Sequence, residues 1–204
     1  YNQPEKINYY LSIFTTTLQN ALTNRPFTFN GQDSIMYDGT KSRVNAIQNV
    51  AQAKVWGIQL GWELFLNKYT KWQSKLNWID GHETDDVKNE QVPLRHAPPL
   101  FGSSAIQWQK KQCTIEVNTQ FNGQINSANL APSEKAKTAI YAVDKAGNPY
   151  APSWHTINIK ASYTIGKMQV HIGWENITNQ RYRPYSSGIV AAGSNIITSL
   201  RYSF

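Results

Sequence analysis

Apolar and polar residues alternate along several long stretches of this chain, and this period of two limits the folds open to it. In the segment HTINIKASYTI, residues 155–165, nearly all odd-numbered positions are apolar and the even-numbered positions are Thr, Asn, Lys and Ser. Successive side chains of a β-strand point to opposite faces, so the pattern predicts a strand with one apolar and one polar face. The last segment, SNIITSLRYSF, alternates in the same way up to Phe204.

The same pattern predicts about eight strands and almost no helix. The tight turn Gly166–Lys167 between two alternating runs indicates a β-hairpin. The predicted strands cover residues 7–22, 50–66, 70–80, 100–109, 112–124, 153–165, 168–178 and 195–204. The sequence therefore predicts an all-β, antiparallel fold in which residues 1–204 belong to one domain.

The connections between these strands alternate between short and long. Short turns are predicted near Asn67–Thr70, Lys110–Lys111 and Gly166–Lys167. Long polar segments are predicted at about 23–49, 81–99, 125–152 and 179–194. Outer-membrane β-barrels have short periplasmic turns and long extracellular loops. The alternation therefore favours a transmembrane barrel whose last residue lies at the periplasmic side.

The aromatic residues also favour a membrane barrel. The chain holds seven Trp, eleven Tyr and seven Phe, and many fall near predicted strand ends on the apolar face, as aromatic girdles at membrane interfaces do. These are Trp56, Trp72, Trp108, Tyr163, Trp174, Tyr202 and Phe204. The polar face is mostly Asn, Gln, Ser, Thr and Gly, and only 16% of residues are charged, which suits a lumen. A soluble antiparallel sandwich is the alternative.

Motifs along the chain resemble those of TonB-dependent outer-membrane receptors. The segment HIGWENITNQRYRPYSSGIVAAGSNIITSLRYSF is similar to the C-terminal end of these receptors. The similarity rests on Asn176, Ile177, Thr178, Tyr182, Ser187, Gly188, Ile189, Ala191, Gly193 and the final aromatic residue. Upstream, PEKINYYLSIF, NVAQAKVWGIQLGWEL and PLRHAPPLFGSSAIQW resemble barrel strands of the same family, in the same order.

This resemblance implies a 22-stranded barrel with a plugged lumen, of which residues 1–204 would be the C-terminal portion. The plug domain and the N-terminal strands would lie outside this chain. The implied function is active uptake of a scarce, bulky nutrient across the outer membrane of a Gram-negative bacterium, with a ferric siderophore or haem favoured. Two alternatives stay open: a SusC-like importer of glycans or oligopeptides, and a complete eight-stranded barrel with a structural or adhesive role.

The resemblance also implies partners. These are the outer-membrane lipid, the plug and N-terminal strands of the same receptor, the TonB complex, and the barrel-assembly machinery; a surface lipoprotein is left open. The closing strand is expected to carry the assembly signal on its lipid face, at Ile196, Leu200, Tyr202 and Phe204. A one-residue slip of this strand would move a charged side chain into lipid.

Two groups of residues are candidates for contact with a ligand. Charged side chains on the polar faces are expected to face the lumen, where they contact the plug, water or substrate: Lys75, Glu116, Lys160, Glu175 and Arg201. The final long loop is the candidate substrate contact, through Arg181, Tyr182, Arg183 and Tyr185. Arginine with aromatic residues suits an anionic or catechol-bearing ligand. The alternative is that these four residues only pack the loop.

No sequence feature predicts an enzyme. The four histidines lack metal-ligand spacing, and no nucleophile elbow or phosphate loop is present. The acidic segment DGHETDD, residues 80–86, is rich in oxygen ligands but lacks the spacing of an EF-hand, so a solvated loop is expected. The net charge of +7 is spread without a basic run. Neither a cofactor nor nucleic acid is therefore expected.

Overall fold

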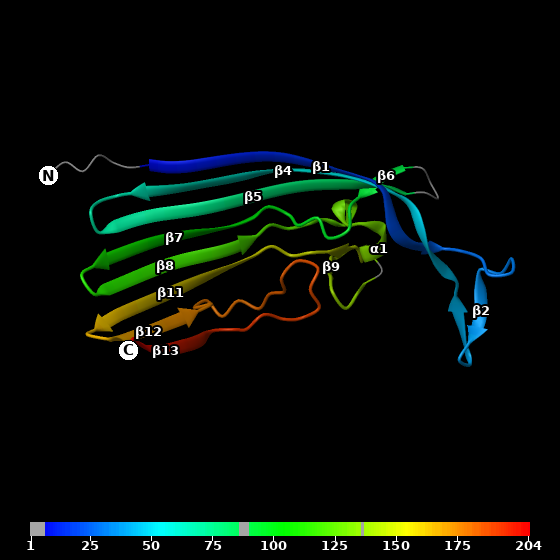
Figure 1. Ribbon diagram of the computed structural model, residues 1–204. Coiled ribbons are helices and arrows are strands. Elements are labelled where there is room, and N and C mark those ends of the chain that lie inside the picture. The colour runs from blue at the N-terminus through cyan, green and yellow to red at the C-terminus, as the bar shows by residue number, and fades with distance from the viewer. Residues whose placement is uncertain (1–6, 86–89, 136) are drawn as a thin grey trace.

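The computed structural model describes residues 7–85, 90–135 and 137–204. Eight long strands, with the short strand Glu90–Pro93 paired at one of them, form one antiparallel sheet, a curved layer whose long strands follow one another along the chain (Figure 1). They are β1 (Ile7–Pro26), β4 (Asn45–Phe65), β5 (Thr70–Asp85), β7 (Phe101–Lys110), β8 (Cys113–Asn122), β11 (Trp154–Ile165), β12 (Met168–Glu175) and β13 (Asn195–Tyr202). The prediction of about eight antiparallel strands is confirmed.

The shorter elements lie in the long connections, at the end of the sheet opposite the short turns (Figure 1). They are β2 (Ser34–Tyr37), β3 (Thr40–Arg43), β6 (Glu90–Pro93), the 3-10 turn η1 (Ser127–Asn129), α1 (Pro132–Lys135), β9 (Ala142–Val143) and β10 (Pro149–Tyr150). The β2–β3 hairpin extends away from the sheet. None of the helices in the described ranges is long and apolar enough to cross a membrane.

The alternation of short and long connections is confirmed, but two long connections are shorter than predicted. The ladder between β1 and β4 continues out to Pro26 and Asn45, and β5 extends to Asp85. Backbone pairing continues here although the sequence no longer alternates, because hydrogen bonds between strands do not require an apolar face. An irregularity between Leu18 and Leu22 shifts the register of β1 against β4, as a β-bulge does.

The acidic segment also differs from its expected structure. Residues 80–85 belong to β5 instead of a solvated loop, and Asp86 lies outside the described residues. Asp80 accepts a hydrogen bond from the indole N–H of Trp56 at 3.0 Å and lies 3.2 Å from Nδ1 of His82. Asp80, near the end of β5, thus has polar partners on its own strand and on β4.

The sheet has one apolar and one polar face, as the alternation predicts. Trp174 of β12 pairs with Ile159 of β11 on one side and with Ile196 of β13 on the other. The apolar face is exposed on every long strand, for example at Ile13, Leu60, Trp78, Ile106, Val117, Ile159, Ile172 and Leu200. Soluble proteins rarely expose so large an apolar surface, and this face has no second sheet packed on it. The soluble sandwich therefore does not fit the described structure.

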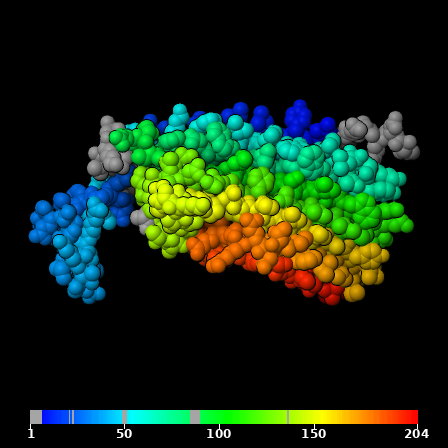
Figure 2. Space-filling view, turned by 180° about the vertical axis from the view of Figure 1, so that it is seen from behind, coloured from blue at the N-terminus to red at the C-terminus, as the bar shows by residue number. Residues whose placement is uncertain are grey.

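The sheet is also open. Strands β1 and β13 form its two edges, and within the described ranges no backbone ladder joins them. In the space-filling view the strands cover one continuous face, from blue at one edge to red at the other (Figure 2). The alternative of a complete, closed eight-stranded barrel therefore does not fit this arrangement.

Aromatic side chains form two layers on the apolar face. Near the short turns, the rings of Trp62 and Trp72 meet edge to face with centroids 5.5 Å apart. Further along the same strands, Trp56 and Trp78 meet edge to face at 4.5 Å. Six residues of β4 separate the two layers, about 20 Å along the strand. Trp72, Trp108, Tyr163, Trp174 and Tyr202 lie near strand ends as predicted, whereas Trp56 lies in mid-strand because β4 begins earlier than predicted.

The buried apolar cluster of the described residues lies in the loops, outside the long strands. Ile125, Leu130, Tyr141 and Ala151 pack together in the connection between β8 and β11, with Leu130 fully buried. This connection was predicted as a polar loop, and in this respect the prediction is wrong. The loop carries enough apolar side chains to bury a small core of its own.

Candidate functional site

A pocket of about 490 Å³ lies between two long loops, the β8–β11 loop and the β12–β13 loop. These loops form adjoining mounds at one end of the sheet in the space-filling view, coloured yellow-green and orange (Figure 2). The walls of the pocket include Ile140, Tyr141, Trp154, Arg181, Tyr182, Arg183, Tyr185 and Val190. The structure therefore brings all four predicted ligand residues of the final loop to one pocket.

Three of these four residues make contacts that hold the two loops together. The ring of Tyr182 stacks on Trp154 with centroids 4.2 Å apart. Nη1 of Arg183 donates to the backbone carbonyl oxygens of Ala139 and Ile140. The hydroxyl of Tyr185 donates to the Glu134 carboxylate at 3.2 Å. These three side chains therefore pack the loops, and their contact with a substrate stays a prediction.

Arg181 differs from its three neighbours. It is exposed, it lines the pocket, and its side chain makes no hydrogen bond or ion pair with the residues that the structure describes. A guanidinium group offers five donors in a planar fork that matches carboxylates and other planar anions. Arg181 is therefore the side chain of this pocket that is free to bind an anion.

The final loop is fixed at its start by Asn176. This buried residue follows β12 with φ of 48°, a left-handed conformation that Asn tolerates better than most residues. Its side-chain amide donates to the carbonyl oxygens of Gln180 and Ala192 at 2.9 and 3.0 Å, and its oxygen accepts from the Gln180 N–H. One side chain thus joins both ends of the loop segment that carries Arg181.

A chain of hydrogen bonds connects Asn176 with the polar face of the sheet. Its backbone N–H donates to Asn158 at 2.8 Å, and the Asn158 amide donates to Asn118 at 2.8 Å. Asn118 in turn donates to Glu116 at 2.9 Å. Asn158 and Asn176 are buried, so these hydrogen bonds replace water for groups that would otherwise be unsatisfied.

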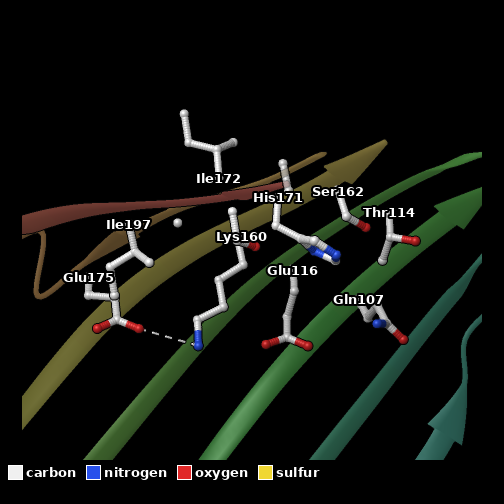
Figure 3. A pocket seen from close by; sticks show the side chains of 12 residues that line it. Gln107, Thr114, Glu116, Lys160, Ser162, His171, Ile172, Glu175 and Ile197 are labelled. Carbon is white, nitrogen blue, oxygen red and sulfur yellow. Dashed lines mark ion pairs between the residues drawn. The ribbon is translucent and has the colours of Figure 1, made fainter. Parts of the chain in front are cut away.

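Glu116 belongs to the second candidate site, on the polar face. Glu116, Lys160 and Glu175 surround a hollow of about 360 Å³, and Lys160 forms an ion pair with Glu175 at 3.5 Å. Figure 3 shows these three side chains extending to one side of the strands, whereas Ile172 extends to the other. Lys75 and Arg201 lie on the same polar face, on β5 and β13, but outside the hollow.

The residues predicted as the assembly signal occupy the opposite face, whereas Ile197 of β13 lines the hollow. Ile196, Leu200, Tyr202 and Phe204 are all exposed. The rings of Tyr202 and Phe204 meet at 5.2 Å. Their contact with lipid and their role as an assembly signal both stay predictions.

Sequence reasoning missed one feature of the loops, a fully buried carboxylate. Glu134 of α1 is 0% exposed and accepts hydrogen bonds from the hydroxyls of Tyr141, Tyr185 and Ser186. Burial raises the pKa of Tyr141 to about 12, and burial together with the charge of Glu134 raises the pKa of Tyr185 further. No periodicity or motif in the segment around Glu134 indicates this burial, because its partners lie up to 52 residues away.

Comparison with known proteins identifies the family. A family model described as "TonB dependent receptor-like, beta-barrel" matches residues 1–177. No curated protein sequence matches the chain.

Three solved structures of similar fold illustrate the extent of the match. The copper transporter OprC is 14% identical, with a TM-score of 0.70 over 98% of this chain and 29% of that chain. The FrpB iron transporter from Neisseria meningitidis is 14% identical, with a TM-score of 0.70; the match covers 100% of this chain and 30% of that chain. The siderophore receptor PirA from Acinetobacter baumannii is 17% identical, with a TM-score of 0.68; the match covers 99% of this chain and 30% of that chain. The chain spans about a third or less of each structure, and identities this low show only the fold.

Proposed function

Because the chain belongs to the TonB-dependent receptor β-barrel family, we propose that it is the C-terminal part of a receptor that imports a ferric siderophore or haem. The family places the protein in the outer membrane of Gram-negative bacteria. The rest of the receptor would supply the plug, the earlier strands and the contact with the TonB complex. The open sheet supports this proposal, since an unpaired sheet edge cannot face lipid.

The two faces of the sheet and its loops support an orientation of the chain in the membrane. The exposed apolar face contacts lipid, and the polar face with Glu116, Lys160 and Glu175 lines the lumen. The short turns and Phe204 lie at the periplasmic side, and the long loops lie outside the cell, as in other outer-membrane barrels. The pocket between the two loops then opens toward the extracellular side, where a ligand arrives.

The pocket suits a flat anionic ligand. Its walls are largely aromatic and aliphatic and include the stacked pair Trp154 and Tyr182 together with Arg181, whose side chain makes no hydrogen bond or ion pair with the described residues. An aromatic surface binds a planar ring, and a guanidinium group binds a carboxylate or a catecholate oxygen. Ferric catecholates and haem both combine these features. The free Arg181 at an aromatic pocket is the observation that carries this choice of ligand.

Replacement of Arg181 by Ala is expected to weaken ligand binding by the full-length receptor about tenfold or more, the loss that follows from removing one charge-assisted hydrogen bond. The receptor should still assemble, because the Arg181 side chain makes no hydrogen bond or ion pair with the described residues. Binding is measured with purified receptor, and uptake with a deletion strain that carries each variant. The panel contains ferric siderophores, haem, cobalamin and glycans.

The matched control is Lys145→Ala, which removes an exposed cation from the neighbouring loop outside the pocket. It should leave binding unchanged. If Arg181→Ala binds the imported ligand as tightly as the unmodified receptor does, the pocket is not the anion site. If the deletion strain loses uptake of glycans only, the proposed cargo is wrong and the SusC-like alternative is correct.

A further inference from the structure

The short turns at one end of the sheet carry lysines and no acidic residues (Figure 1). Lys68 lies in the turn between β4 and β5, Lys111 in the turn between β7 and β8, and Lys167 in the turn between β11 and β12. Residues 64–72, 107–114 and 164–170 contain neither Asp nor Glu. The β2–β3 hairpin at the other end, residues 34–43, carries charges of both signs. The end of the sheet with the short turns is therefore positively charged.

Two of these turns lie side by side and bring three lysines together. The N–H of Gln109 donates to the carbonyl oxygen of Tyr69 at 2.7 Å, which joins the two turns. Nζ of Lys68 lies 4.8 Å from the centroid of the Tyr69 ring, and Nζ of Lys110 lies 5.5 Å from it. Lys68 and Lys111 also line a hollow of about 430 Å³ between the turns. Lys68, Lys110 and Lys111, the turn lysines, thus form one cationic patch.

The turn lysines have no carboxylate to balance their charge. They are exposed, and their ammonium groups make no hydrogen bond or ion pair with the described residues. Lys71, beside them, differs because it forms an ion pair with Glu63 at 3.1 Å. A cation–π contact holds an ammonium group near a ring without neutralising it, and like charges placed close together repel each other. The patch therefore favours an anion from outside the described residues.

This cationic patch is continuous with the apolar face of the sheet. Lys110 is two positions beyond Trp108 on β7, so the two side chains lie on the same face. The rings of Trp62 and Trp72 form the aromatic layer that lies near the short turns. A lysine at the edge of a lipid-facing surface lays its aliphatic stem along that surface and extends its ammonium group toward the headgroups. In the proposed orientation, the turn lysines lie at the level of the periplasmic headgroups.

From this arrangement, we propose that the turn lysines bind the headgroups of acidic phospholipids in the periplasmic leaflet of the outer membrane. The proposal rests on the proposed orientation, in which the apolar face contacts lipid and the short turns lie at the periplasmic side. An acidic headgroup supplies the missing negative charge, and its acyl chains lie against Trp108 and its apolar neighbours. A zwitterionic headgroup has no net charge, so the patch discriminates between the two kinds of lipid. Continuity with the apolar face favours a lipid over a soluble anion.

The test titrates purified full-length receptor in a neutral detergent with dioleoyl phosphatidylglycerol or with dioleoyl phosphatidylcholine. Native mass spectrometry counts the lipids that stay bound. The unmodified receptor should retain the acidic lipid at least tenfold more tightly than the zwitterionic lipid, and added salt should weaken this preference. Combined replacement of the three turn lysines by Gln should lower the preference at least tenfold, because each lysine beside an anionic surface contributes about fivefold.

The matched control removes the same charge from the long connections, through combined Lys41→Gln, Lys135→Gln and Lys145→Gln. These three lysines are exposed at the other end of the sheet, and their removal should leave the lipid preference unchanged. Every variant must show the gel mobility of the folded barrel before its lipids are counted. The single variants Lys68→Gln and Lys111→Gln, each expected to lower the preference about fivefold, decide the test if the triple variant does not assemble.

Equal retention of the two lipids by the unmodified receptor would overturn the proposal. Equal loss of preference in the control variant would also overturn it, because net charge alone would then explain the effect. Displacement of the acidic lipid by inorganic phosphate would indicate a site for a free anion, and displacement by poly-glutamate would indicate a site for an acidic protein segment. Either result would overturn the assignment to lipid. Ligand binding at the Arg181 pocket is measured separately, so failure here leaves the import proposal intact.

Discussion

Replacement of Ile172 by Arg is expected to remove most of the assembled receptor from the outer membrane. Ile172 is 52% exposed in the middle of the apolar face, where it pairs with Ala161 of β11 and Thr198 of β13. A charged side chain on the lipid face of a barrel costs about 2–4 kcal/mol near the midplane. The amount of folded receptor is measured from outer-membrane fractions, since the folded barrel migrates faster than the heat-denatured chain in a gel.

The matched control is His171→Arg, one position away on the same strand. His171 lies on the polar face beside Ser162 and Ser199, where an arginine can be solvated. The folded yield of this variant should stay close to that of the unmodified receptor. If Ile172→Arg assembles as well as His171→Arg does, the apolar face does not contact lipid.

Replacement of Gly102 by Ala is expected to have the second large effect. A Cβ atom at Gly102 would clash with the backbone oxygen of Lys75 and lie 2.9 Å from the ring of Phe121. The backbone oxygen belongs to β5, which pairs with β7 at this position, so it cannot move without disturbing the ladder. Overpacking of this kind typically costs about 1–3 kcal/mol. Loss of folded receptor and a lower denaturation temperature in detergent are the expected results.

Gly173→Ala is the control for this variant, because Gly173 is also a glycine within a strand. The atom nearest to a Cβ there is a side-chain carbon of Lys160 at 3.7 Å, an ordinary contact. This variant should assemble and denature like the unmodified receptor. Equal stability of the two alanine variants would mean that β5 and β7 do not approach as closely as the described register requires.

The sequence predicted the strands best where one face is apolar. In β11 and β12 successive residues lie on opposite faces of the sheet, so the alternation indicates which face each side chain occupies. The prediction was less accurate for the outer parts of β1 and β4. There the ladder pairs apolar with polar residues, as in Leu22 with Asn49 and Ile47 with Asn24, and such a ladder leaves no periodic signal in the sequence.

The loop sites could be predicted only in part. Arg181, Tyr182, Arg183 and Tyr185 are close in sequence, so their gathering in one loop was foreseeable. Their different roles were not, because Ala139 and Glu134 reach them from another loop and Trp154 reaches them from the start of β11. Contacts between residues 28 to 51 positions apart depend on how two loops fold together, and no local pattern encodes them.

The central claim is that the apolar face contacts lipid and the polar face contacts the water-filled or plugged lumen. The most direct measurement uses nitroxide spin labels on Ile172→Cys and His171→Cys in full-length receptor that lacks other cysteines, reconstituted in lipid bilayers. Oxygen concentrates in lipid, whereas a nickel chelate stays in water. The label at position 172 should be relaxed by oxygen and protected from nickel, and the label at position 171 should be protected from lipid-borne oxygen. Equal access of nickel to both positions would contradict the account.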